Sequence, residues 1–327
     1  VNQANALWTL SKSEITDEQY QDLYKHISHD FQEPMAWAHN RVEGKNEYIS
    51  LLYIPKHAPF DLWNREQQRG LKLYVKRIFI MDDAEQLMPM YLRFVKGVVD
   101  SSDLPLNVSR ELIQKDRQIT LINKAVVSKL LRNFKKMLTK DRETYVKFWK
   151  NFGSTLKEGI AMDFSNKDAI TDLSLFESSE REGYITLKEY VEKMPEAQKD
   201  IYYMTGESLD IMKTSPYLEK LKEKGYEVLL FTDPVDEWVL NSLTEYDKKK
   251  MVSITKGNLD LSTEEEKKEK EKELEETSNR LKPLCESIQK ALSDSIKDVK
   301  VTDRLVKSPV CLVSGENDPS AHMERML

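Results

Sequence analysis

The clearest pattern of apolar and polar positions lies over residues 119–138, where apolar side chains recur at three- and four-residue steps. This spacing predicts a long helix with one buried face. The helical pattern continues over residues 141–156, and its dense aromatic residues predict the packing of helix against helix. Nearer the start of the chain, residues 16–19 (TDEQ) have the form of a capping box and predict a helix over about residues 17–29.

Two further segments, residues 47–54 and 71–80, are rich in β-branched and aromatic residues and predict strands. The loop between them contains Phe60 and Trp63, which are large apolar groups among polar neighbours. These side chains either anchor the loop to the sheet or form part of an exposed binding patch, and the pattern leaves both interpretations open.

The second half of the chain has a strand–helix–strand rhythm over residues 200–205, 215–224 and 228–232. The short joints predict a parallel βαβ unit with a right-handed crossover, and hence a second, smaller α/β domain. Residues 167–183 and 236–246 are expected to be helical. Ligands in such sheets tend to bind beyond the carboxyl ends of the strands, but no glycine-rich phosphate-binding motif follows either strand.

Residues 262–280 form a charge-dense run in which acidic and basic side chains alternate. The run predicts a solvated helix or a hinge-like linker, and we place a domain boundary there. An amphipathic helix is expected over residues 281–292, and short strands over 298–302 and 310–313. Residues 321–327 are expected to form a helix with an apolar face.

Composition narrows the function. The 327 residues are too many for one ordinary core, so two or three domains are expected. The net charge of −6 argues against a nucleic-acid binder that neutralises phosphates. The two cysteines form no CxxC pair, which suits a reducing cytosol, and no apolar run reaches the ~20 residues that span a membrane. No signal peptide is evident, and the chain is expected to be a piece of a longer protein.

A lone arginine, Arg110, lies in the segment 101–114 (SSDLPLNVSRELIQ), just after Pro105 and at the expected start of a helix. Its guanidinium is expected to be presented at a loop–helix junction, with donors available for an anion. The alternative is a surface arginine that pairs with Asp103 or Glu111.

Motifs typical of a free-standing enzyme are missing, since the sequence has no HExxH and no GxSxG, and the pair His26 and His29 has no evident third metal ligand. Several large apolar residues lie in polar surroundings instead: Trp8, Phe60, Trp63, Trp238, Met323 and Met326. An anion-sensing arginine together with apolar surface suggests a regulated binding protein.

Longer motifs carry a family resemblance. Five motifs resemble the middle domain of the heat-shock protein 90 chaperones and occur in the same order. They are SSDLPLNVSRELIQ, FWKNFGSTLKEGI (148–160), DIYYMTGES (200–208), VLLFTDPVDEW (228–238) and SPVCLVSGE (308–316). The resemblance covers essentially the whole chain and is strongest to the bacterial branch of the family.

The resemblance implies a dimeric, ATP-driven molecular chaperone with three domains per protomer. The implied fold class is α/β, or α+β overall. It comprises a large α/β/α sandwich in residues 1–140, a helical connector in 141–182 and a smaller α/β/α domain with βαβ units in 183–261. A charged helix and a truncated, mixed α+β C-terminal domain would occupy residues 262–327. ATP and Mg²⁺ would be held by an N-terminal domain outside this chain, so no cofactor, metal or ATPase activity is expected of the chain alone.

By the same resemblance, Arg110 matches the arginine that reaches the ATP γ-phosphate in the closed state, and Gln114 matches a neighbouring glutamine of the catalytic loop. A second group of residues is implied to bind client proteins: Glu237, Trp238, Asn241, Met323, Met326 and Leu327. Trp8 and Phe60 resemble positions linked to client or inter-domain contact. Pro319 departs from the family pattern, which calls the start of the terminal helix into question.

The implied partners are non-native or partly folded client proteins, the N-terminal ATPase domain of the same chain, a second protomer and a DnaK-type chaperone system. Neither nucleic acid nor membrane is expected as a partner, and the expected location is the cytoplasm. One alternative is a self-contained α/β enzyme or small-molecule-binding domain, with its site at the carboxyl ends of strands 201–204 and 228–231. Another is a passive structural scaffold.

Overall fold

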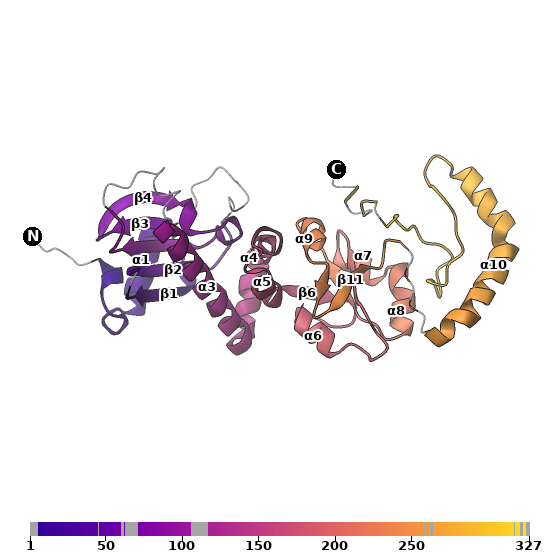
Figure 1. The fold of residues 1–327 in the computed structure, drawn as a ribbon, viewed down its shortest axis with the longest axis horizontal. Coiled ribbons are helices and arrows are strands. Elements are labelled where there is room, and N and C mark those ends of the chain that lie inside the picture. The colour runs from indigo at the N-terminus through magenta and orange to yellow at the C-terminus, as the bar shows by residue number, and fades with distance from the viewer. Residues whose placement is uncertain are drawn as a thin grey trace, which may run out of the picture. The chain divides into compact units, whose positions relative to one another are not determined.

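The computed structural model describes residues 6–44, 46–59, 62, 71–105, 117–257, 259, 261, 264–316, 318–320 and 323–324. Its contacts divide the chain into two compact units, Val1–Ser174 and Leu175–Leu327 (Figure 1). Each unit combines a β-sheet with helices, so the chain is of the mixed α+β class that the sequence predicts. The division after Ser174 falls within the predicted helical connector, and the finer predicted boundaries stay predictions.

The first unit is built on a five-stranded sheet with the strand order β1-β2-β5-β3-β4. Its strands are β1 (Pro34–Val42), β2 (Tyr48–Pro55), β3 (Leu71–Val75), β4 (Ile78–Ala84) and β5 (Lys96–Ser101). Neighbouring strands are antiparallel except β3 and β5, which are parallel. The strand predicted over residues 47–54 is confirmed by β2, which is almost wholly buried.

The single strand predicted over residues 71–80 is wrong, because this segment turns back on itself as the hairpin β3–β4. Lys76 and Arg77 form its two-residue turn, and their φ angles are 48° and 68°. Such turns favour Asn or Gly, so the charged pair gives no turn signal. The turn is tied to β5 instead: the backbone N–H of Lys76 donates to the carbonyl of Ser101 (3.0 Å), and that of Arg77 donates to the Asp100 carboxylate (3.1 Å).

The helices of the first unit confirm the predicted helical pattern. They are α1 (Asp17–Ser28), α3 (Arg117–Lys140), α4 (Arg142–Met162) and α5 (Lys167–Leu173), with the short 3-10 helices η1 (Leu7–Thr9), η2 (Lys12–Glu14), η3 (Glu85–Leu87) and η4 (Met90–Leu92). Thr16 caps α1 through the predicted capping box with Gln19. The apolar stripe of α3 is buried as predicted, except for Leu121, which is exposed.

Aromatic rings fill the core where α3 and α4 meet. Phe94 stacks on Phe152 of α4 with ring centroids 4.5 Å apart, and Phe134 of α3 stacks on Phe148 of α4 at 4.7 Å. All four rings are fully buried. The predicted packing of helix against helix is therefore confirmed.

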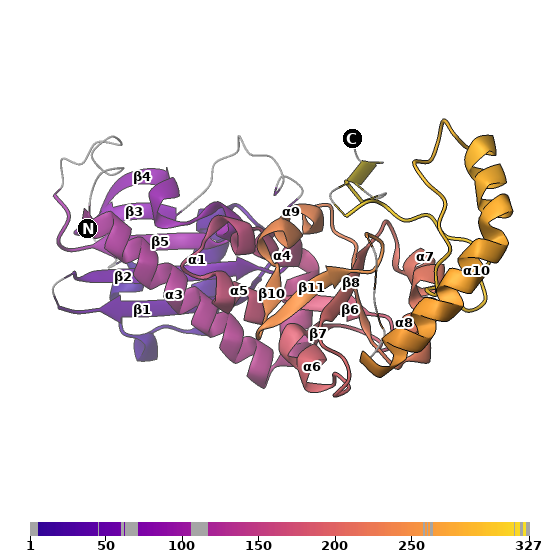
Figure 2. The same cartoon turned by 45° about the vertical axis from the view of Figure 1, so that its right-hand side comes forward.

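The second unit has a six-stranded sheet with the order β10-β11-β8-β9-β6-β7 (Figure 2). Its strands are β6 (Leu175–Ser178), β7 (Ile185–Thr186), β8 (Ile201–Thr205), β9 (Val228–Phe231), β10 (Glu245–Tyr246) and β11 (Lys249–Ser253). Its helices are α6 (Leu187–Glu192), α7 (Leu209–Lys213), η5 (Pro216–Leu218), α8 (Glu219–Glu223), α9 (Asp236–Ser242) and α10 (Glu264–Ala291). β8 and β9 are parallel and joined through helices, which confirms the predicted βαβ unit.

Four other predictions for the second half need correction. The helix expected over residues 236–246 ends with α9 at Ser242, because Glu245 and Tyr246 pair with β11 as strand β10. The helix expected over residues 167–183 ends with α5 at Leu173, and β6 follows because its buried Leu175 and Phe176 join the sheet between β9 and β7. The segments 262–280 and 281–292 are not separate helices, since α10 runs through both. Residues 298–302 and 310–313 are not strands; in this region the described residues form only an isolated bridge between Lys256 and Ser314.

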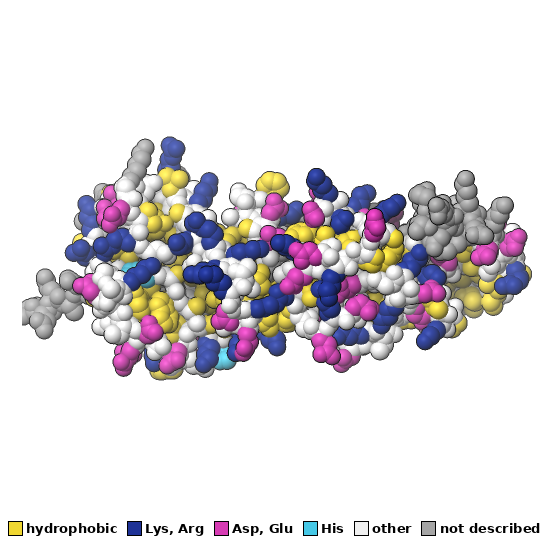
Figure 3. All heavy atoms as spheres, turned by 90° about the horizontal axis from the view of Figure 1, so that it is seen from below, with side chains coloured by type: hydrophobic (Ala, Val, Ile, Leu, Met, Phe, Trp, Pro, Cys, Tyr) yellow, Lys and Arg dark blue, Asp and Glu magenta, His cyan; other side chains and the backbone are white. Residues whose placement is uncertain are grey.

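On the face drawn in Figure 3, basic and acidic side chains are interspersed rather than gathered into areas of one sign. Within the described residues, no helix is both long and apolar enough to cross a membrane.

Candidate functional site

The predicted client-binding residues of α9 lie where this helix meets the end of β8. Glu237 stands in the first turn of α9, and its Oε1 accepts a hydrogen bond from Oγ1 of Thr205, the last residue of β8 (2.7 Å). The start of α9 is fixed as well, because the buried carboxylate of Asp236 accepts from the backbone N–H of Asp233 (3.0 Å). The local fold therefore holds Glu237 in one position against the sheet.

The same Glu237 oxygen also accepts a hydrogen bond from the hydroxyl of Ser320. Ser320 is only 2% exposed, although it lies in a largely exposed part of the chain. Its Oγ accepts from the backbone N–H of Met323 (3.0 Å), and its carbonyl accepts from that of Glu324 (2.9 Å). Ser320 is therefore the N-cap of the helical turn that carries Met323.

Pro319 immediately precedes this N-cap. A proline interrupts a helix from within, because it lacks an N–H and clashes with the preceding turn, but a position before the N-cap makes no intrahelical bond. Met323 and Glu324 are helical. The departure at Pro319 is thus compatible with the start of the terminal helix.

The side chains around this anchor differ in exposure. Trp238 is 44% exposed and Met323 is 36% exposed, while Asn241 is exposed and Glu237 is half-buried. Two large apolar side chains thus reach the surface from segments that are joined through Glu237 and Ser320. The predicted residues Met326 and Leu327 lie outside the described residues.

The carboxyl ends of β8 and β9, where a small-molecule site would be expected, are occupied by the protein itself. The backbone N–H of Gly206 donates to the carbonyl of Phe231 (3.0 Å), and the thioether of Met212 lies where a side chain at Gly206 would be. Thr205 bonds to Glu237. The geometry therefore does not support a ligand site at these strand ends.

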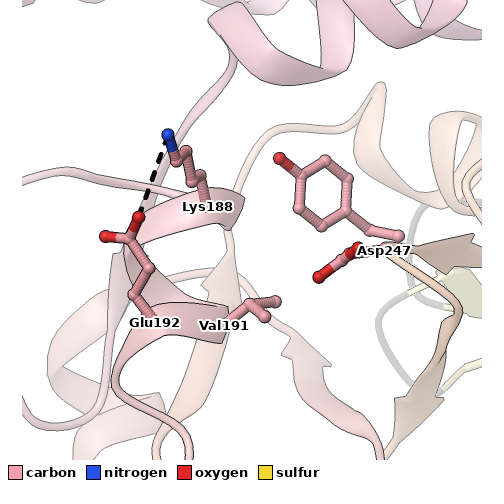
Figure 4. A pocket seen from close by; sticks show the side chains of 5 residues that line it. Lys188, Val191, Glu192 and Asp247 are labelled. Carbon is pink, nitrogen blue, oxygen red and sulfur yellow. Dashed lines mark ion pairs between the residues drawn. The ribbon is translucent and has the colours of Figure 1, made fainter.

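A shallow pocket of about 430 Å³ lies elsewhere, between α6 and the β10–β11 hairpin (Figure 4). It is lined by Lys188, Val191, Glu192, Tyr246 and Asp247. Lys188 and Glu192 form an exposed pair at 3.9 Å along α6, which is a weak interaction. The pocket holds no nucleophile–base pair, and the described residues contain no group of three or more His, Cys, Asp or Glu side chains that could bind a metal.

The prediction that Trp8 contributes apolar surface is wrong. Its side chain is only 7% exposed, its ring lies 4.6 Å from that of Tyr74, and its Nε1 donates to the Asp100 carboxylate (2.9 Å). A tryptophan whose N–H finds a buried acceptor is stable in a core, which the polar neighbours of Trp8 in the sequence do not reveal. A client contact by Trp8 stays a prediction, and it would require the ring to leave this site.

The predicted catalytic residues Arg110 and Gln114 lie outside the described residues, as do Phe60 and Trp63, so the two interpretations of that loop stay open. The structure does fix the strand that leads toward Arg110. Near the end of β5, the Asp100 carboxylate accepts hydrogen bonds from Nε1 of Trp8 and the backbone N–H of Arg77. Just after this strand, Oδ2 of Asp103 accepts from the backbone N–H of Glu47 (2.6 Å).

The sequence did not reveal Thr205 or Ser320 as parts of the site. Ser320 follows a proline and precedes an apolar stretch, which is a weak N-cap signal that could have been read. Its bond to Glu237 spans 83 residues, and no local pattern encodes such a contact.

Comparison with known proteins adds a family relationship. The model of the family described as "Hsp90 protein" matches residues 1–327. Similar curated proteins are the "Chaperone protein HtpG" of Chromobacterium violaceum, 53% identical over 332 residues, and that of Dechloromonas aromatica, 52% identical over 330 residues. Each alignment covers 100% of this chain and 52% of the relative, so the chain spans about half the length of these proteins.

A solved structure is similar as well. The middle domain of a Plasmodium falciparum heat shock protein aligns with a TM-score of 0.69 and 34% sequence identity. The alignment covers 76% of this chain and 99% of that domain.

Proposed function

The chain belongs to the Hsp90 family, and from this premise we propose that it is the client-binding middle part of a bacterial chaperone. The family and the middle-domain fold rest on the comparisons. The client surface is our proposal, and we assign it to Trp238, Asn241 and Met323. One observation supports it above the others: Trp238 and Met323 are both exposed and belong to segments joined through Glu237 and Ser320.

Physical chemistry favours this surface for non-native proteins. A partly exposed tryptophan offers a large apolar face, and exposed apolar groups near one another mark interaction sites. Methionine is flexible and polarisable, so it adapts to partners of different shapes. An unfolded client presents varied apolar side chains, and a surface of this kind can accept many of them.

The test is suppression of client aggregation by the 327-residue chain and by the full-length protein. Trp238→Arg should weaken suppression several-fold, because it replaces an apolar contact with a charge. Ile211→Arg is the matched control, since Ile211 is an exposed apolar residue of the same unit. Equal suppression by the wild type and Trp238→Arg would contradict the client surface and favour a passive scaffold.

We further propose that, in the whole protein, Arg110 completes the ATPase site of an N-terminal domain that holds ATP and Mg²⁺. An arginine delivered from another domain offsets charge on the transferring phosphoryl group, and its delivery couples hydrolysis to domain closure. Gln114 would lie in the same loop. The support is the SSDLPLNVSRE motif, which resembles the family's catalytic loop.

Steady-state ATP hydrolysis by the full-length protein tests this role. Arg110→Ala should lower the rate at least tenfold, whereas Arg132→Ala, an exposed arginine of α3, should leave it unchanged. A normal rate in Arg110→Ala would exclude the role. Calorimetry of nucleotide binding to the chain alone would distinguish the chaperone proposal from the alternative of a self-contained enzyme, because micromolar binding would favour the enzyme.

The remaining features of the whole protein are proposals from the family. They are homodimerisation, cooperation with a DnaK-type chaperone system and a cytoplasmic location.

A further inference from the structure

Glu237 is already occupied as a hydrogen-bond acceptor. Its Oε1 accepts hydrogen bonds from two hydroxyl groups, that of Thr205 at the end of β8 (2.7 Å) and that of Ser320 in the C-terminal segment. A carboxylate that bonds hydroxyl groups forms charge-assisted bonds, which are stronger than those between neutral groups. The side chain is half-buried between these donors. This arrangement suits an internal anchor better than a group that must bind an incoming protein.

The bond to Glu237 also determines what Ser320 can do. A serine hydroxyl has one proton to donate and lone pairs to accept with. Because the proton points at Glu237, the lone pairs are left for the backbone N–H of Met323, which donates to Oγ at 3.0 Å. The carboxylate therefore orients the N-cap of the turn that carries Met323.

The segment before Ser320 is held by other contacts. Ser314 bonds through its backbone to Thr255 (3.2 Å) and Gly257 (3.0 Å), and Asp318 pairs with Lys297 (2.9 Å). Among the described residues after Asp318, the side-chain hydrogen bond to the helices and strands of the second unit is the one from Ser320 to Glu237. Loss of Glu237 should therefore release Met323 and Glu324 and leave Ser314 and Asp318 in place.

We propose that Glu237 is a positioning residue: it docks the Met323 turn on α9, so that Met323 and Trp238 present one apolar surface. This inference rests on the proposed client surface and gives Glu237 a role in positioning that surface rather than a place in it. Trp238 and Met323 contact the client, and Glu237 acts through Ser320.

The first experiment measures hydrogen–deuterium exchange of the Met323 and Glu324 amides in the 327-residue chain without any client. Ser320→Ala should raise exchange roughly 2- to 30-fold, the range expected for the loss of an N-cap, and Glu237→Gln, which keeps a neutral acceptor oxygen but loses the charge, should raise it by a smaller factor. Ser320→Thr, which keeps a hydroxyl, should remain within about twofold of the wild type. Glu245→Gln, an exposed glutamate of β10, is the control and should change nothing.

The second experiment measures suppression of client aggregation by the same variants and by the double variant Glu237→Gln/Ser320→Ala. If Glu237 acts through Ser320, the double variant should be no weaker than the weaker single variant. Because Glu237 also bonds Thr205, Glu237→Gln affects β8 as well as the terminal segment, whereas Ser320→Ala leaves the Thr205 bond in place and removes both bonds of the Ser320 hydroxyl, to Glu237 and from the Met323 N–H.

Unchanged exchange in both Glu237→Gln and Ser320→Ala would overturn the proposal. So would a further loss of suppression when Glu237→Gln is added to Ser320→Ala, because Glu237 would then touch the client directly. Failure of the client surface itself would look different: Trp238→Arg would keep full suppression, while the exchange results would still show the anchor.

Discussion

The indole Nε1 of Trp8 donates a hydrogen bond of 2.9 Å to Oδ2 of Asp100, across 92 residues of sequence. The other oxygen of this buried carboxylate accepts from the backbone N–H of Arg77 in the β3–β4 turn (3.1 Å). One aspartate therefore ties together η1, the hairpin turn and the end of β5. This strand leads toward the segment that contains Arg110.

Trp8→Phe should destabilise the first unit by about 1–3 kcal/mol, because it keeps an aromatic ring but leaves a buried carboxylate without one of its donors. Urea unfolding followed by circular dichroism gives the free energy. Trp238→Phe is the matched control, since the exposed ring of Trp238 should tolerate this change within about 0.5 kcal/mol. Equal effects of the two substitutions would show that the Trp8–Asp100 bond adds no stability.

A buried ion pair between α4 and the residue that follows η4 gives a second prediction. Arg93 and Glu158 form a two-point pair with both N–O distances at 2.8 Å, and their side chains are only 8% and 11% exposed. Glu158→Gln should cost about 3–5 kcal/mol, because it leaves the charge of Arg93 buried without compensation.

The control for this prediction lies on the same helix. Glu143 pairs with Lys147 at 2.8 Å in an exposed position, so Glu143→Gln should cost at most about 1 kcal/mol. Thermal unfolding of both variants makes the comparison. A loss below about 1 kcal/mol in Glu158→Gln would mean that Arg93 finds other acceptors, such as the carbonyls of Leu62 and Met90 that it already contacts.

The sequence predicted those parts of the fold whose causes are local. The α3 stripe, the Thr16 capping box and the βαβ unit each follow from periodicity or capping residues within one segment. The β3–β4 turn could not be predicted from local sequence, because hydrogen bonds to β5, and not the conformational preferences of Lys76 and Arg77, hold these two residues in left-handed conformations.

The site shows the same division. Glu237, Trp238 and Met323 were identified through the family resemblance, and the structure links their two segments. Thr205 and Ser320 could not be found from their surroundings, since their role depends on a carboxylate distant in sequence. The burial of Trp8 was missed for a similar reason, because its acceptor is Asp100.

A third prediction concerns pH and His39, which is buried in the first unit. Its Nε2 lies 2.9 Å from the carbonyl of Trp8, which can only accept, so Nε2 carries the proton and Nδ1 accepts from the hydroxyl of Tyr20 (2.8 Å). Burial, and then the charges of Lys12 and Arg41, lower the pKa of His39 below its ordinary value of 6.5. Because the unfolded chain binds the proton more readily, this contribution to stability is complete above pH 6.5 and is lost as the pH falls further.

The free energy of unfolding should therefore decrease between pH 7.5 and pH 5.5 in the wild type, and this decrease should be smaller in His39→Gln. His57→Gln, a change at an exposed histidine, should keep the wild-type slope. Parallel curves for the wild type and His39→Gln would contradict the assignment of the pH dependence to His39.

The last prediction concerns Glu219, which binds residues 306–308 of the C-terminal segment; we call these three residues the strap. Its carboxylate accepts from the backbone N–H groups of Val306 (2.7 Å), Lys307 (2.7 Å) and Ser308 (3.1 Å), and from the Ser308 hydroxyl (2.5 Å). These donors, with the Ser308 hydroxyl foremost, lower the pKa of Glu219 to about 2. The contact is therefore complete above the ordinary pKa of 4.5 and is lost only as the pH falls toward 2.

Glu219→Gln should release the strap at neutral pH, since an amide offers one acceptor oxygen and turns its own N–H donors toward the backbone donors. Faster hydrogen exchange at residues 306–308 is the expected result, with Glu245→Gln as an exposed control. In the wild type, the amide chemical shifts of these residues should stay constant between pH 6 and pH 4. A shift with a midpoint near 4.5 would show that Glu219 titrates as an ordinary glutamate and does not hold the strap.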